Sequence, residues 1–195
     1  MKDLEIILTD VNVDLVASWN KGKHLVYNTR VLLGPFQELA ADAIVAPGNS
    51  FALMDGGVDL ILRDEFGFEI QDQIAGKATE VFGMPIIPVG TAIAQELPRS
   101  KSFRYVIYTP TMEVPMNIVG TVNAYLATRA ALFRADQLGI HSIVFMGMGA
   151  LTGGLTSSEC ASQMLSAIKD FQNISQLEKY TDWDTIREIG TSIHV

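Results

Sequence analysis

The chain has 195 residues, of which 48% are apolar, so it can bury a substantial core, and a single domain over residues 1–195 is expected. Its formal net charge of −8 at pH 7 argues against a nucleic-acid-binding surface, because such surfaces neutralise phosphates with clustered lysine and arginine side chains. The single cysteine, Cys160, excludes an internal disulfide and fits a reducing compartment, so we expect a soluble cytoplasmic protein.

The first half of the chain alternates short apolar runs with helical patterns. Strands are predicted at residues 4–9, 25–33 and 43–46, and helices at 11–19, 58–65 and 68–82. The strand at 43–46 is apolar throughout, as is typical of a central parallel strand that is buried on both faces. Asp10 or Asn12 is the expected N-cap of the first helix.

The second half continues the alternation, which predicts an α/β fold with helices on both faces of a sheet. Strands are predicted at 89–95, 105–109 and 142–146, and helices at 118–138, 157–171 and around 182–189. Gly139 is placed to end the longest helix, and Thr156 or Ser157 to begin the next. The expected core face of the longest helix consists of Val122, Tyr125, Leu126, Ala130 and Phe133.

A glycine-containing loop follows the third predicted strand. It contains Asn49 and Ser50 at the strand exit, then Asp55, Gly56 and Gly57 before the helix that starts at Val58. A strand, a polar loop and a helix start together present backbone amides to an anion, because the first amides of a helix have no internal partners. The pattern therefore predicts a site for a phosphorylated small molecule.

Two residues of this loop region have alternative interpretations. Asn49 is positioned to reach a ligand at the carboxyl ends of the strands, but Asn after Gly also often satisfies local backbone groups. Asp59, in the first helical turn, is a candidate site carboxylate or a partner of the helix dipole.

A second glycine-rich loop follows the strand at 142–146 and precedes a capped helix. It consists of Gly147, Met148, Gly149, Ala150, Leu151, Thr152, Gly153 and Gly154. Its spacing does not match the dinucleotide-binding fingerprint, and the acidic residue about twenty positions later, Asp170, falls inside a predicted helix. Because the loop follows a buried strand and precedes a capped helix, we predict that its amides form a second wall around a diphosphate.

The segment from Asp42 to Asp59 resembles the macrodomain family, whose members bind ADP-ribose. The matching residues are Asp42-Ala43-Ile44-Val45, Asn49, Gly56-Gly57-Val58 and Asp59. The ten-residue step from Asn49 to Asp59 equals the spacing of the catalytic Asn and Asp in the hydrolase branch. Three segments are similar to bacterial macrodomain-like proteins: 49–57, 111–115 and 121–132. The resemblance runs from about residue 31 to 168.

The resemblance implies a three-layer α/β/α fold with a mixed, mostly parallel central sheet. Its core would span residues 25–172, with 173–195 as a C-terminal extension. Asn49 and Asp59 would be catalytic, with Asn49 binding the distal ribose and Asp59 orienting or deprotonating a water molecule. The implied ligand-binding residues are Asn49, Ser50, Asp55, Gly56, Gly57, Val58 and the loop from Gly147 to Gly154.

The chain departs from the family pattern at both ends of the expected ligand. Many macrodomains have Gly-Asp-Ile after the second strand, and the Asp binds the adenine amino group; this chain has Gly34-Pro35-Phe36, which leaves Phe36 as a possible base contact. Ala150 and Leu151 stand where the family commonly has Thr-Gly.

The sequence is compatible with three functions. The first is an ADP-ribosyl hydrolase or O-acetyl-ADP-ribose deacetylase acting on ADP-ribose or an ADP-ribosylated substrate. The second is a reader that binds ADP-ribose or another nucleotide without turning it over, and the third is a scaffold with a degenerate site.

Cofactors, metals and membranes are not expected. The histidines His24, His141 and His194 are scattered and form no metal-ligand spacing. The amino terminus lacks the long apolar core of a secretory signal, and no apolar run is long enough to span a bilayer. The sequence leaves the oligomeric state open.

Overall fold

The computed structural model describes residues 4–173. The strands are β1 (Glu5–Asp10), β2 (Thr29–Leu33), β3 (Ala41–Asn49), β4 (Ile93–Glu96), β5 (Phe103–Met112) and β6 (Ser142–Phe145). The α-helices are α1 (Val13–Gly22), α2 (Gly57–Phe66), α3 (Glu69–Phe82), α4 (Asn123–Leu138) and α5 (Ser157–Gln172). Two 3₁₀ turns, η1 (Lys23–Leu25) and η2 (Phe36–Glu38), flank β2. The helix predicted around 182–189 lies outside the described residues.

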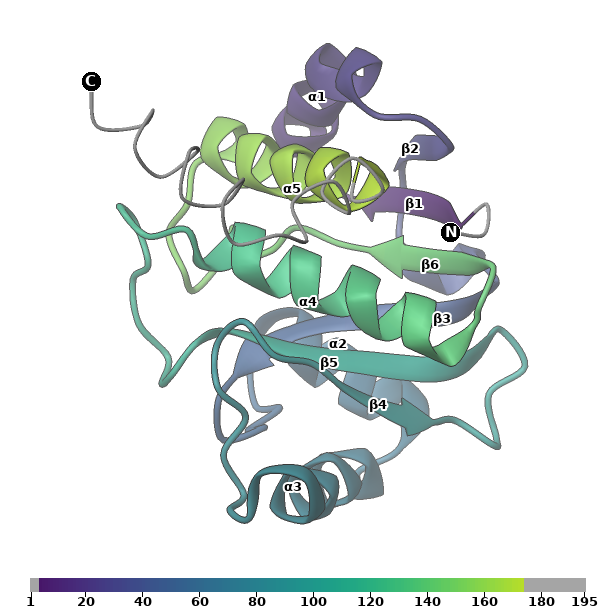
Figure 1. Ribbon diagram of the computed structural model, residues 1–195, viewed down its shortest axis with the longest axis vertical. Helices are drawn as coiled ribbons and strands as arrows, with labels where there is room; N and C mark the ends of the chain where they lie inside the picture. The colour runs from purple at the N-terminus through teal and green to yellow at the C-terminus, as the bar shows by residue number, and fades with distance from the viewer. Residues whose placement is uncertain (1–3, 174–195) are drawn as a thin grey trace, which may run out of the picture.

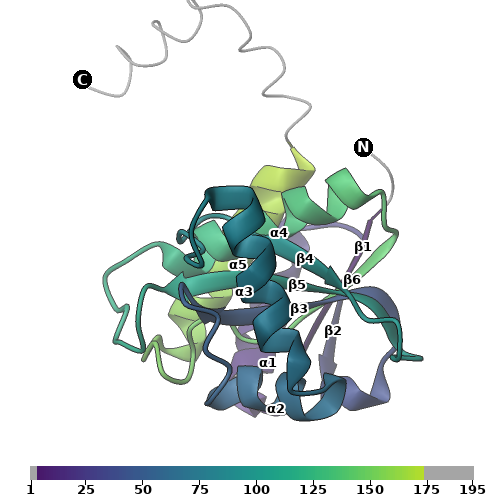
Figure 2. The same ribbon diagram turned by 90° about the horizontal axis from the view of Figure 1, so that it is seen from below.

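The strands form one mixed sheet in the order β2-β1-β6-β3-β5-β4. All neighbouring pairs are parallel except β4 and β5. One buried cluster lies between the sheet and α1, α4 and α5, and a second lies between the sheet and α2 and α3. Figure 1 shows α4 and α5 in front of the strands, and Figure 2 shows α4 and α2 on opposite sides of them. The predicted three-layer α/β/α fold with a mostly parallel sheet is therefore confirmed.

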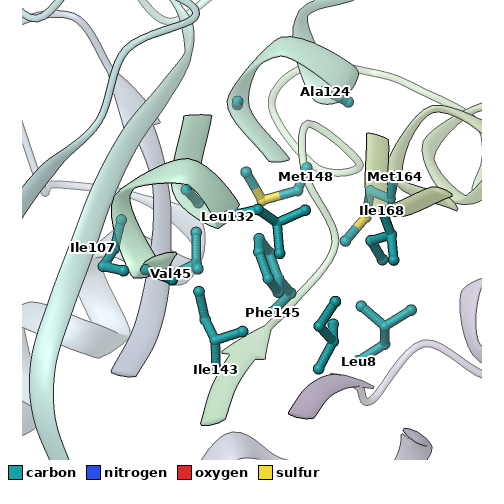
Figure 3. Close-up of a cluster of buried hydrophobic side chains, with 14 of the residues drawn as sticks. Leu8, Val45, Ile107, Ala124, Leu132, Ile143, Phe145, Met148, Met164 and Ile168 are labelled. Carbon is teal, nitrogen blue, oxygen red and sulfur yellow. The ribbon is translucent and has the colours of Figure 1, made fainter. Parts of the chain in front are cut away.

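The apolar runs of the central strands follow from burial on both faces. In β1, Ile6 and Leu8 belong to the cluster under α1, α4 and α5, whereas Ile7 points into the opposite cluster. Side chains alternate across a strand, so a strand covered on both faces must be apolar at every position. Figure 3 shows Phe145 of β6 in the middle of the first cluster, with Leu132 of α4 nearby.

The helix caps explain where the helices begin and end. Asn12, rather than Asp10, caps α1, because its side chain accepts from the amides of Asp14 and Leu15. Thr156 and Glu159 form a reciprocal capping box at the start of α5. Gly139 ends α4 in the left-handed conformation, with φ of 64°.

The longest predicted helix was wrong in its start and in its core face. It begins at Asn123 instead of Ile118, and Val122 is 59% exposed. The fully buried face consists of Ala124, Ala127, Thr128, Ala131, Leu132 and Ala135, whereas Tyr125, Leu126, Ala130 and Phe133 are only partly buried. Small side chains let α4 lie close to the sheet and α5, so the large apolar residues used for the prediction fall at the margins of the contact.

The remaining differences concern strand ends. The strand predicted from Leu25 begins only at Thr29, because residues 23–25 form η1 and Asn28 has a positive φ of 47°. The third and fifth strands, β3 and β5, extend beyond their predicted ranges. Within residues 4–173, no helix is long and apolar enough to cross a membrane.

Candidate functional site

Parallel pairing of β3 with β6 brings the two glycine loops to the same edge of the sheet. Ala43 pairs with Ile143 and Ile44 with Val144, so both strands run in the same direction into their loops. The first loop follows Asn49 at the end of β3, and the second follows Phe145 at the end of β6. The carboxyl edge of a parallel sheet is where ligands of α/β folds commonly bind.

A cavity of about 150 Å³ lies between these loops. Its lining includes the predicted site residues Asn49, Asp55, Gly56, Gly57, Val58, Asp59, Gly147, Gly149, Leu151, Thr152 and Gly153. It also includes Thr111 and Met112 at the end of β5, which are not among the predicted ligand-binding residues. The structure thus brings together segments that are about a hundred residues apart.

A larger cavity of about 420 Å³ lies on the β1 and β2 side of the same loops. It is lined mainly by apolar groups, together with Asp10, Pro35 and Phe36. The two cavities share the lining residues Gly57, Val58, Gly147 and Leu151. They therefore adjoin each other at the two glycine loops.

Three predicted residues line neither cavity, and two, Ala150 and Phe36, line only the larger one. Ser50 and Met148 are buried, and Met148 packs in the core beneath the second loop. Gly154 has a φ of 71° and lies beside Asn117, so it serves the turn of the loop. Ala150 lines the larger cavity instead of the smaller one.

The start of α2 leaves its first backbone amides without partners among the described residues. Gly56 is the N-cap and has no side chain, and the first backbone bond into the helix is from Leu60 N to Gly56 O. The amides of Gly57, Val58 and Asp59 therefore have no intrahelical acceptor. In contrast, the capping box of α5 satisfies the amides of Thr156 and Glu159. The positive electrostatic end of α2 is open to the cleft.

The second loop is held in shape by backbone contacts. Gly149 O accepts from Leu155 N at 3.2 Å, and Gly153 O accepts from Ile118 N at 2.8 Å. A side chain at Gly153 would overlap Gly149 O, so glycine is required there for the close approach. Leu151 is 68% exposed, and a Cβ atom placed on Gly57 would lie 3.8 Å from Leu151 Cδ1. The Leu151 side chain therefore extends across the cleft toward the first loop, where the two cavities adjoin.

The Asn49 side chain is bonded to its own loop. Its Oδ1 accepts from Phe51 N at 3.1 Å and Leu53 N at 3.3 Å, and its Nδ2 donates to Leu53 O at 2.9 Å. This is the local backbone role given as the alternative interpretation of Asn49. An amide nitrogen carries two hydrogens, so one hydrogen of Nδ2 is left for another acceptor in the cavity that Asn49 lines.

Tyr108 holds the end of β3 in position, a role that sequence reasoning did not assign. The β3–β5 register shifts between Gly48 and Asn49, and the buried Tyr108 hydroxyl fills the irregularity. It accepts from Asn49 N and donates to Asn49 O, both at 2.9 Å. A side chain at Gly48 would overlap this hydroxyl and crowd Asp59 Oδ2. The only sequence signal was a glycine before Asn49, and its meaning depends on the register with β5.

Asp59 is a buried carboxylic acid at the wall of the smaller cavity. It is only 5% exposed, and its Oδ1 has no hydrogen-bond partner within residues 4–173. Burial raises the pKa of Asp59 to about 7, and the charge of Asp55 adds to the rise. Burial also raises the pKa of Tyr108 well above its ordinary value.

Phe36 lines the larger cavity but is mostly covered. Its ring is 5% exposed and packs against Phe103 with the ring centroids 6.4 Å apart. Little of the ring is therefore open to a stacked base. In the described part of the chain, no cluster of three or more His, Cys, Asp or Glu residues is arranged to hold a metal ion.

Comparisons with known proteins identify related sequences and folds. A family profile described as Macro domain matches residues 45–164. An uncharacterized protein of Aquifex aeolicus is 36% identical over 143 residues, covering 73% of this chain and 82% of the relative. One from Aeropyrum pernix is 34% identical over 149 residues, covering 76% and 73%.

Solved structures agree with the sequence matches at the level of the fold. The macrodomain of Mycobacterium tuberculosis DarG aligns with a TM-score of 0.59 at 17% identity, covering 74% of this chain and 88% of that one. A mutant of the Oceanobacillus iheyensis macrodomain with ADPR aligns with a TM-score of 0.63 at 19% identity, covering 87% and 78%. At these identities the likeness shows a shared fold.

Proposed function

Because this chain belongs to the macrodomain family, we propose that it binds ADP-ribose in the cleft between the two glycine loops. The observation that carries the proposal is the uncapped start of α2, at Gly57 and Val58, facing the Gly147–Gly154 loop where the two cavities adjoin. Unpaired amides at a helix start bind phosphate oxygens. The Oceanobacillus iheyensis macrodomain, which shares the fold, has been solved with ADPR and with ADP.

The two cavities suggest the orientation of the ligand. The larger, mainly apolar cavity suits a base, whereas the smaller cavity beside Asn49 and Asp59 suits a ribose with its hydroxyl groups. The diphosphate would then lie at Gly57 and Gly147, which line both cavities. With a net charge of −8, the protein attracts no polyanion at long range, so the amides must provide the affinity locally.

We further propose hydrolysis of a bond at the distal ribose, with Asp59 as the general base. Asp59 Oδ1 would take a proton from water while the water oxygen bonds to the anomeric carbon and the group attached there leaves. A base with a pKa of about 7 is matched to neutral pH, and such positioned bases contribute roughly 10²–10⁴-fold to a rate. The free hydrogen of Asn49 Nδ2 would hold a ribose hydroxyl in this reaction.

A non-catalytic reader is the second candidate function. The observation in its favour is that three backbone hydrogen bonds already occupy the Asn49 side chain. In a reader, Asn49 would only shape the loop, and Asp59 would take no proton from water.

Binding is tested by isothermal titration of the protein with ADP-ribose, using AMP, ADP and NAD as comparators. Gly57 and Gly83 both have positive φ, 58° and 75°, so alanine strains the backbone at either position. Only Gly57 lines the cleft, so G57A should weaken ADP-ribose binding at least tenfold while G83A leaves the affinity unchanged. No heat and no rise in melting temperature at millimolar ADP-ribose would refute the binding proposal, because a ligand at ~100 times its Kd adds ~2.7 kcal/mol.

Hydrolysis is tested separately, by product release from O-acetyl-ADP-ribose and from a mono-ADP-ribosylated protein. Asp59→Asn should abolish turnover while ADP-ribose still binds, and Asp64→Asn, an exposed change on the same helix, should not alter turnover. Binding without any turnover by the unaltered protein would favour the reader.

A further inference from the structure

The larger cavity contains a carboxylate that the proposed function has not used. Asp10 is the last residue of β1 and lines this cavity. Its Oδ2 accepts from Gly147 N at 3.1 Å, and its Oδ1 accepts from Asn12 N at 2.9 Å. Two backbone amides therefore fix the carboxylate between the ends of β1 and β6. Each carboxylate oxygen accepts about two hydrogen bonds, so acceptor capacity remains on both.

Among the described residues, no charged hydrogen-bond acceptor other than Asp10 lines the cavity. Among the described residues that line the cavity, it is the only ionisable side chain. Two lining side chains carry amide oxygens, Asn12 and Gln37, and Asn12 Oδ1 already accepts from the amides of Asp14 and Leu15 at the start of α1. The surrounding side chains are mainly apolar, among them Val11 and Ile61. A carboxylate in such a setting favours a ligand that brings a hydrogen-bond donor.

Asp10 also lies beside the Gly34-Pro35 segment, where the resemblance to macrodomains implies an aspartate. Asp10 pairs with Leu33 in the β1–β2 ladder, and Gly34 N donates to Asp10 O at 3.1 Å. Pro35, the next residue, occupies the place at which the resemblance led us to expect an aspartate. Proline offers neither an acceptor side chain nor a backbone donor. Asp10, at the end of the neighbouring strand β1, thus places a carboxylate in the same cavity.

We propose, resting on the proposed binding of ADP-ribose, that Asp10 selects the base by accepting a hydrogen bond from the exocyclic amino group of adenine. A hydrogen bond from a neutral donor to a charged acceptor is stronger than one between neutral groups. Hypoxanthine carries a carbonyl oxygen at the same position, so two hydrogen-bond acceptors, this oxygen and the Asp10 carboxylate, would face each other. The protein should therefore bind ADP-ribose roughly 10–100-fold more tightly than its hypoxanthine analogue.

The test is isothermal titration of the full chain with ADP-ribose and with the hypoxanthine analogue, inosine diphosphate ribose. In Asp10→Asn, the neutral amide offers a donor as well as an acceptor, so the affinity ratio of the two ligands should fall to within about threefold of one. The control is Asp14→Asn, which removes the same charge from an exposed position outside the cavity and should keep the ratio of the unaltered protein. A purely structural role of Asp10 would lower both affinities and leave their ratio unchanged.

The outcomes separate the two proposals. Equal affinity of the unaltered protein for both ligands would overturn the role of Asp10 while keeping ADP-ribose binding, and it needs no variant to fold. An unchanged ratio in a folded Asp10→Asn variant would overturn it as well. Binding of neither ligand by the unaltered protein would refute the proposed function itself, and the role of Asp10 with it.

Discussion

Burial of the Asp59 carboxyl group predicts that the free energy of unfolding falls as the pH rises. The pKa of Asp59 is raised from 3.8 to about 7 in the folded protein, so the folded state binds a proton more tightly than the unfolded chain. Well below pH 3.8 Asp59 is protonated in both states and has no effect on stability. Between pH 4 and pH 7 Asp59 ionises in the unfolded chain while it stays largely protonated in the folded protein, so the free energy of unfolding falls over this window. Above pH 7 the group is ionised in both states, and the fall is complete.

The magnitude follows from the size of the shift. About three pKa units at 1.36 kcal/mol each give a destabilisation on the order of 4 kcal/mol when Asp59 is fully ionised. Between pH 5 and pH 8 alone, the change is about 2.5 kcal/mol, because part of the loss has already occurred at pH 5. Asp59→Asn keeps the shape of the side chain and removes the titration. The variant should therefore gain about 2.5 kcal/mol relative to the unaltered protein over this range.

The assay is urea unfolding of both proteins at several pH values from 5 to 8, with the difference in unfolding free energy plotted against pH. Taking the difference cancels the contributions of the other titrating groups. Asp64→Asn is the matched control, since Asp64 lies on the same helix with a 58% exposed side chain and should give a flat difference. An equally flat difference for Asp59→Asn would show that Asp59 ionises as freely in the folded protein as in the unfolded chain, and would refute the reasoning.

Three further substitutions test the supports of the site, each by urea unfolding. Gly48→Ala should destabilise the protein by about 3 kcal/mol because the methyl group overlaps the Tyr108 hydroxyl, whereas Gly56→Ala, with no atom within 4 Å, should have little effect. Tyr108→Phe should lose about 1–3 kcal/mol, because Asn49 N loses its acceptor and Asn49 O keeps only the bond from Ala52 N, and titration calorimetry should show weaker ADP-ribose binding. Thr156→Ala should lose about 1 kcal/mol with the capping box but leave ADP-ribose affinity unchanged, and weaker binding would place the start of α5 in the site.

The sequence predicted most of the fold because its signals are local. An apolar run such as Ile6-Ile7-Leu8 indicates burial on both faces, and Thr156 with Glu159 indicates a helix start. The two glycine loops were predicted to form two walls around a diphosphate. They lie at the same edge of the sheet because the strands that precede them are parallel. None of these inferences required knowledge of which strands are neighbours.

The features that escaped prediction depend on distant pairing. The role of Tyr108 at Asn49 exists only because the β3–β5 register shifts at Gly48, sixty residues before the tyrosine. The position of Asp10 beside Pro35 requires β1 and β2 to be neighbours with a particular register. The core face of α4 was missed for a different reason, since alanines that allow close packing give a weak apolar signal.

Two features that are unfavourable in the free protein lie together at the start of α2. Side chains cap α1 and α5, whereas α2, α3 and α4 have no side-chain cap among the described residues, and of these α2 begins at a glycine that lines the cleft. The buried carboxylate of Asp59 lies in the first turn of α2, and its Oδ1 has no hydrogen-bond partner within residues 4–173. Open amides and an unpaired buried oxygen are unfavourable in the free protein, and a ligand with anionic oxygens and hydroxyl groups would satisfy both. A scaffold without a ligand has no physical reason to keep these unfavourable features together, so their clustering favours a binding site over a degenerate one.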